Sequence, residues 1–75
     1  MLEMRPDCES CGKDLPAEQD GALICSFECT FCDSCNNEKL HDTCPNCGGA
    51  LMPRPTRSVA LLAKFPASAE RKYQA

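Results

Sequence analysis

Residues 25–35 read Cys-Ser-Phe-Glu-Cys-Thr-Phe-Cys-Asp-Ser-Cys, so four cysteines fall within eleven positions. Two further Cys-x-x-Cys pairs flank this stretch, Cys8 with Cys11 before it and Cys44 with Cys47 after it. A Cys-x-x-Cys turn brings two thiols to one point, and a structural zinc ion takes four such ligands in a tetrahedron. The spacing therefore predicts two complete zinc sites (Zn2+, two per chain).

The size of the chain makes a metal staple necessary. The chain has 75 residues, eight of them cysteine, with one tyrosine and no tryptophan. A domain of this size rarely supplies more than about 3–5 kcal/mol from its hydrophobic core alone. The amino terminus lacks the apolar run of a secretion signal, and no stretch approaches the roughly 20 apolar residues of a membrane span. We therefore expect a cytoplasmic protein with reduced, metal-binding thiols and no membrane association, and disulfides are the weaker alternative.

Local sequence predicts the structure around each pair of thiols. Residues 8–12 and 44–48 each end in glycine and are expected to form tight turns. Residues 22–25 and 29–31 are expected to pair as a short β-hairpin around residues 26–28.

A short helix is expected to follow the hairpin. Its N-cap would be Asp33 or Ser34, Cys35 would lie in its first turn, and Lys39 and His41 would lie near its end. A turn, a hairpin and a helix in this order form a treble clef.

Treble-clef topology favours an interleaved pairing of the cysteines. The first zinc site would contain Cys8, Cys11, Cys32 and Cys35, and the second Cys25, Cys29, Cys44 and Cys47. The alternative is a sequential pairing, with Cys8, Cys11, Cys25 and Cys29 on one ion and Cys32, Cys35, Cys44 and Cys47 on the other. The predicted fold is a small, metal-dominated α+β domain with two cross-braced sites.

The chain divides into an acidic zinc-binding domain and a basic tail. Residues 1–52 carry ten acidic and three basic side chains, a net charge of −7, whereas residues 53–75 carry five basic and one acidic, a net charge of +4. Pro53 and Pro55 favour an extended boundary between them. Two zinc ions on eight thiolates would bring the domain to about −11, which repels phosphate and does not favour a nucleic-acid partner.

Within the tail, the sequence predicts a short helix at residues 58–65. The rest of the tail is expected to be flexible. Thr56 or Ser58 would cap this helix, and Pro66 would end it. Its apolar side chains form a stripe that either packs on the zinc domain, stays disordered or binds a partner.

The cysteine-rich stretch 25–35, followed by Cys-Pro-Asn-Cys at 44–47, resembles a RING finger with cysteine in the usual histidine position. Together with Met-Leu-Glu-Met-Arg-Pro at 1–6, Lys-Asp-Leu-Pro at 13–16 and the following Gly-Gly at 48–49, it resembles a small bacterial family, catalogued as domain of unknown function 1272. The resemblance covers about residues 1–52. It implies a zinc-bound RING-like fold and no assigned activity.

The chain departs from RING ubiquitin ligases at the positions that grip the conjugating enzyme. Such ligases usually carry a bulky apolar residue after the first zinc ligand, where this chain has Glu9. They often place tryptophan between the sixth and seventh ligands, where residues 36–43 have none, and a cation after the last ligand, where Gly48 and Gly49 stand. Only Pro45 matches.

Eight thiols leave no open coordination position, so the pattern predicts structural rather than catalytic zinc, and no enzyme. His41 is expected at a helix end or facing solvent rather than on a metal. Phe31 is predicted to lie in the core, and Phe27 at the hairpin tip is the candidate binding residue. The sequence thus predicts a zinc-binding module that recognises a protein partner. The alternatives are a ubiquitin-ligase-like enzyme and a zinc-ribbon nucleic-acid binder.

Overall fold

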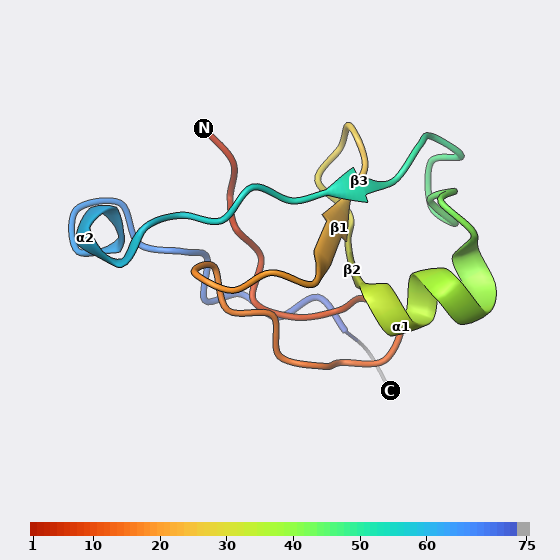
Figure 1. Cartoon of the computed structure of the whole chain (residues 1–75), viewed down its shortest axis with the longest axis horizontal. Coiled ribbons are helices and arrows are strands. Elements are labelled where there is room, and N and C mark those ends of the chain that lie inside the picture. The colour runs from red at the N-terminus through yellow and green to blue at the C-terminus, as the bar shows by residue number, and fades with distance from the viewer. Residues whose placement is uncertain (74–75) are drawn as a thin grey trace.

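A computed structural model describes residues 1–73, and the last two residues of the predicted tail, 74 and 75, lie outside this range. A three-stranded antiparallel sheet of order β2-β1-β3 forms its centre (Figure 1). The strands are β1 (Ala22–Ile24), β2 (Thr30–Cys32) and β3 (Met52–Pro53). The helical elements are α1 (Asp33–Cys35), the π-helical turn η1 (Asn36–Leu40) and α2 (Val59–Leu62). None of these helices is long and apolar enough to cross a membrane.

Strands β1 and β2 form the predicted hairpin. Leu23 lies opposite Phe31 in an antiparallel register. The tip is closed by the backbone N–H of Glu28, which donates to the carbonyl of Cys25 at 3.0 Å, and Glu28 adopts a φ of 63°. The prediction of a hairpin around residues 26–28 is confirmed.

Strand β3 was not predicted. Met52 pairs with Ile24, and Pro53 with Leu23, so the boundary drawn between residues 52 and 53 falls inside a strand. The strand has two residues and lies at the edge of the sheet. Proline is tolerated there because the N–H that it lacks would face away from the sheet, where no neighbouring strand could accept it. Hydrophobic alternation over two residues carries no detectable signal, so only the sheet reveals this pairing.

The predicted helix is present, but its cap differs from the prediction. Cys32, not Asp33 or Ser34, is the N-cap, because its backbone is extended and its thiol accepts the N–H of Cys35 at 3.5 Å. The sulfur accepts a backbone N–H of the first helical turn, as a side-chain oxygen does at an ordinary N-cap. Cys35 lies in the first turn, as expected. The helix ends at His41, which has a left-handed backbone with a φ of 48°.

Sulfur dominates the interior of the domain. Among the described residues, nine buried side chains form the hydrophobic core, and five of them are cysteines. The other four are Leu15, Ala22, Phe31 and Leu51. Phe31 is only 2% exposed, which confirms its predicted core position. A core with one aromatic ring and two leucines is too small to hold the chain together without the cysteines.

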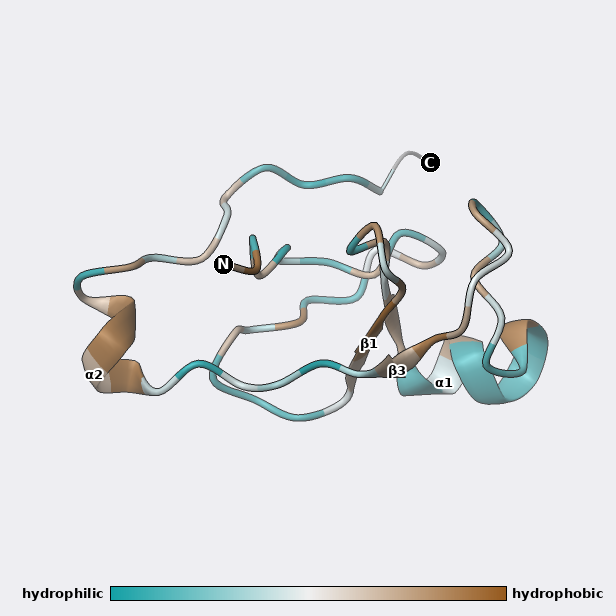
Figure 2. Ribbon diagram, turned by 90° about the horizontal axis from the view of Figure 1, so that it is seen from above, coloured by the Kyte–Doolittle hydropathy of each residue, from teal (hydrophilic) through white to brown (hydrophobic). Residues whose placement is uncertain are grey.

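The segment after β3 crosses back over the domain to α2, which lies at the far end of the molecule (Figure 1). Ser58, one of the two predicted caps, accepts the N–H of Leu61 at 3.4 Å. The helix covers four residues rather than the expected 58–65. Figure 2 shows α2 as an apolar element set apart from the sheet, and its residue Val59 is 71% exposed.

Arg54 fastens this segment to the amino-terminal part of the chain. Its guanidinium donates to the carbonyls of Arg5 at 2.8 Å, of Leu15 at 2.9 Å and of Pro16 at 3.4 Å. The residue is 6% exposed, and burial lowers its pKa. Arginine suits this position because its rigid fork presents several donors at once.

We predict that Arg54→Met destabilises the protein by about 2–4 kcal/mol, because the buried carbonyls lose charged donors while the aliphatic stem is kept. Lys64→Met, on an exposed residue of the same segment, is the matched control and is expected to change stability by less than about 0.5 kcal/mol. Urea unfolding at one fixed zinc concentration measures both. Equal midpoints for the two variants would contradict the prediction.

Candidate metal centre

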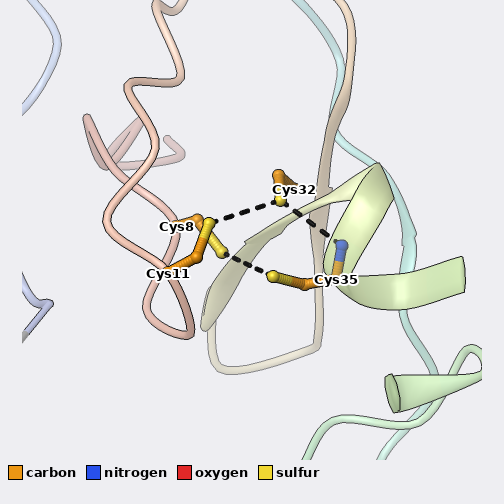
Figure 3. A group of neighbouring side chains, drawn as sticks. All are labelled: Cys8, Cys11, Cys32 and Cys35. Carbon is orange, nitrogen blue, oxygen red and sulfur yellow. Dashed lines mark hydrogen bonds between the residues drawn. The ribbon is translucent and has the colours of Figure 1, made fainter. Parts of the chain in front are cut away.

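The first cluster joins four cysteines that lie up to 27 positions apart in the sequence. Cys8 and Cys11 come from the turn at residues 8–12, Cys32 from the end of β2 and Cys35 from α1 (Figure 3). Their side chains point toward one another, and all four sulfurs lie within 4.8 Å of each other.

The sulfur separations fit a tetrahedral metal ion. The Sγ atoms of Cys8 and Cys35 are 3.8 Å apart, and those of Cys11 and Cys32 are 3.7 Å apart. Four sulfurs at about 2.3 Å from one tetrahedral zinc ion would lie about 3.8 Å from each other. All eight cysteines of the chain are free thiols. The cluster therefore has both the donor chemistry and the spacing that a thiolate-bound metal requires.

The two Cys-x-x-Cys turns share one hydrogen-bond pattern. In the first, Cys8 N–H donates to the carbonyl of Lys13 at 2.9 Å, and Gly12 N–H donates to the carbonyl of Cys8 at 2.8 Å. In the second, Cys44 N–H donates to Gly49 at 2.8 Å and Gly48 N–H to Cys44 at 2.9 Å. The glycine that follows each pair has a φ of 79° or 78°. Glycine is needed there because a side chain disfavours this conformation.

Backbone N–H groups also donate to sulfur at several positions. Ser10 N–H reaches the thiol of Cys8 at 3.4 Å, Phe27 N–H that of Cys25 at 3.3 Å, and Gly49 N–H that of Cys47 at 3.4 Å. Such bonds favour the thiolate, since a hydrogen bond to the charged form stabilises it. At Cys25 burial raises the pKa, but hydrogen bonds from Phe27 and from neighbouring thiols outweigh it and lower the pKa to about 7.

The second cluster contains three sulfurs within 4.8 Å of one another, those of Cys25, Cys44 and Cys47. Cys29, the predicted fourth ligand, lies outside that set. Burial raises the pKa of the Cys29 thiol to about 11, and contacts with Cys25 and Cys44 act in the same direction, although Asn46 opposes the shift. The structure thus groups seven of the eight cysteines in the interleaved arrangement, and Cys29 is not part of the second group.

Glu9 connects the two clusters, a role that the sequence did not reveal. Its carboxylate accepts the N–H of Thr30 at 2.9 Å and the side-chain amide of Asn46 at 3.3 Å. It also pairs with Arg5 at 3.2 Å. Asn46 lies between the two cysteines of the second turn, as Glu9 does in the first. The only sequence signal is that each polar residue stands inside a Cys-x-x-Cys pair.

Two other residues that the sequence singles out, His41 and Phe27, have exposed side chains. His41 is exposed beyond the end of η1. Phe27 is 71% exposed at the hairpin tip. Both positions match what the sequence predicts for these residues.

These features define a small cysteine-cluster domain: a short antiparallel sheet and a short helix hold two groups of thiols, and each group could hold a metal ion. Residues 1–57 match the family described as "Protein of unknown function (DUF1272)". The chain belongs to this family.

A relative from Rhizobium meliloti (strain 1021), described as an uncharacterized protein, is 55% identical over 71 residues. The match covers 95% of this chain and 84% of the relative. No solved structure matches the chain significantly.

We predict that the apparent affinity for zinc rises steeply with pH between about 6 and 8, because every thiol must lose its proton before it binds. Burial, followed by contacts with neighbouring thiols, raises the pKa of Cys35 to about 12, so this thiol is protonated at neutral pH without metal. Competition against a chelator of known pH dependence measures the effect. An affinity independent of pH would show that thiolates are not the ligands.

Proposed function

We propose that the protein binds two structural zinc ions in a RING-like cross-brace built on a treble clef. The geometry of the first cluster carries this proposal. Two pairs of thiols from separate elements converge at sulfur separations of 3.7 and 3.8 Å, as tetrahedral zinc requires. Soft thiolates select zinc over magnesium or calcium.

In the second site, Cys29 completes the set begun by Cys25, Cys44 and Cys47. The backbone N–H of Cys25 donates to the carbonyl of Cys29 at 3.3 Å, so the hairpin tip holds these two residues next to each other. An ion that replaces the thiol protons would attract the fourth sulfur to the common centre. With four thiolates on each ion no coordination position is open for substrate, which favours a structural role without catalysis.

Metal binding and folding are one process in this proposal. Five of the nine core residues are cysteines, and metal-free thiols that share a small interior bring little favourable contact. The binding free energy of structural zinc is then folding free energy.

We predict that protein purified without added metal carries two zinc ions per chain in native mass spectrometry. Cys35→Ser and Cys44→Ser each lose one ion, whereas the control Ser34→Ala, on an exposed residue beside Cys35, keeps both. Chelation under reducing conditions collapses the amide NMR dispersion, because the thin core cannot stay folded alone. A folded metal-free protein would contradict the proposal.

The zinc module acts by binding a protein partner through the hairpin tip. Phe27 at that tip is 71% exposed, and Met52 on the neighbouring edge strand is 63% exposed. Large apolar side chains held on a rigid scaffold are typical anchors of protein interfaces.

We expect that Phe27→Ser weakens binding of the partner by about 1–3 kcal/mol, the usual cost of removing an aromatic anchor. A proteome pull-down would compare the wild type, Phe27→Ser and the control Val59→Ser, whose residue is equally exposed on α2. A true partner must bind the wild type and Val59→Ser but not Phe27→Ser in the pull-down. The same difference in binding must then be found by titration with the purified proteins. Retention of every candidate by Phe27→Ser would refute the hairpin tip as the contact.

Two alternatives receive less support. In RING ligases the position of Glu9 contacts the conjugating enzyme, whereas here its carboxylate is engaged by Thr30 and Asn46. A basic tail that binds nucleic acid needs free cations. Arg54 and Arg57 donate to backbone carbonyls instead, and Arg71 pairs with Asp14 at 2.8 Å.

A further inference from the structure

The carboxyl-terminal residues 68–73, here called the strap, run back from α2 to the first Cys-x-x-Cys turn (Figure 1). The strap begins where Ser68 N–H donates to the carbonyl of Glu3 at 2.9 Å. It lies entirely beyond the residues that match the family, 1–57.

Asp7, the residue before the first cysteine, receives the strap. Lys72 N–H is 3.1 Å from both carboxylate oxygens, and Tyr73 N–H donates to Oδ2 at 2.8 Å. Asp7 is fully buried. A buried carboxylate is costly unless it is hydrogen-bonded, so these successive N–H groups are what makes its burial tolerable.

Three further contacts, made by Arg71 and Tyr73, fasten the strap to the other side of the same turn. Arg71 donates to Asp14 Oδ1 at 2.8 Å and to the carbonyl of Gly12 at 2.7 Å. The ring of Tyr73 lies so close to Gly12 that a Cβ atom there would be 2.7 Å from Cδ2 of the ring. The strap thus holds both ends of the turn that carries Cys8 and Cys11.

In the described part of the chain, the second turn has one side-chain hydrogen bond to a distant segment, the exposed bond from Asn46 to Glu9 at 3.3 Å. Gly48, which corresponds to Gly12, has no atom within 4 Å of a Cβ placed on it. Pro45, Asn46 and Cys47 of this turn are all exposed.

We infer that the strap is a latch on the first metal site, which slows release of that ion while the second ion remains the exchangeable one. The inference rests on the proposed zinc binding and assigns different kinetic roles to the two sites. An ion leaves a four-thiolate site only when the turn that supplies two ligands opens. Opening of the first turn must also break the bonds from the strap to Asp7 and Gly12, whereas opening of the second turn breaks no bond to the strap and only the exposed bond from Asn46 to Glu9 at 3.3 Å.

The test uses the full chain with Lys72→Pro and its matched control, Lys72→Ala. Proline removes the backbone donor that bonds Asp7, whereas alanine keeps this donor and loses only the side chain. Each protein is loaded with 113Cd and challenged with excess chelator, and the two cadmium NMR signals, assigned with Cys35→Ser and Cys44→Ser, give one release rate per site. We expect Lys72→Pro to release the first-site ion about tenfold faster, as loss of a hydrogen bond to a charged group implies. Lys72→Ala should match the wild type at both sites.

A second comparison tests the ring contact. Gly12→Ala and Gly48→Ala introduce the same backbone strain, but only Gly12→Ala collides with Tyr73. Gly12→Ala should therefore accelerate release of the ion from the first site. This acceleration should be larger than the one that Gly48→Ala causes at the second site. Adding Tyr73→Ala to Gly12→Ala should remove the collision and the excess destabilisation, as a double-mutant cycle on thermal unfolding would show.

The outcomes separate this inference from the function on which it rests. Equal first-site release rates for Lys72→Pro, Lys72→Ala and the wild type would overturn the latch while leaving zinc binding intact. A wild type that binds no metal would overturn both. Faster first-site release in Lys72→Pro alone, with the second site unchanged, would support the latch.

Discussion

The convergence of cysteine sulfurs from distant parts of the chain is the constraint on which the rest of the structure depends. Within residues 1–73, the sheet has three strands of three, three and two residues, and no helical element is longer than five residues. Elements this short are not stable alone, because the cost of ordering them exceeds what their few contacts return. The hairpin and the first helix persist because thiols anchor them. Strand β2 delivers Cys32, α1 carries Cys35, and the hairpin tip begins at Cys25.

Polar side chains also join distant segments of the chain. Glu9 spans the two clusters, Arg54 collects carbonyls from three residues, and Asp7 receives the strap. In each case a long-range hydrogen bond joins segments that hydrophobic contact is too sparse to hold. A small interior gains rigidity in this way only if every buried polar group is satisfied, because the low dielectric that strengthens a bond also penalises its absence.

The sequence predicted the features that depend on local chemistry and missed those that depend on distant partners. The hairpin, the buried Phe31, the exposed Phe27 and the short helix follow from spacing and residue type, and the structure contains them. The N-cap was assigned to Asp33 or Ser34 because oxygen is the usual acceptor, but in the structure the sulfur of Cys32 takes that place. Strand β3 is missing from the prediction because the pairing of two residues leaves no periodic pattern in the sequence. The docking of residues 71–73 is missing because it depends on hydrogen bonds to residues up to 66 positions away.

By itself the sequence determined that this protein is a small cysteine-cluster domain, since four paired thiol spacings admit few other structures. Only the tertiary structure decided which cysteines meet. The choice between interleaved and sequential grouping depends on how β2 and α1 place Cys32 and Cys35 against the first turn; the order of the predicted elements favours the interleaved grouping, but the spacing along the chain is compatible with both. The same holds for Asp7: its carboxylate is one of ten acidic groups in the first 52 residues, and only the return of the chain from α2 buries it.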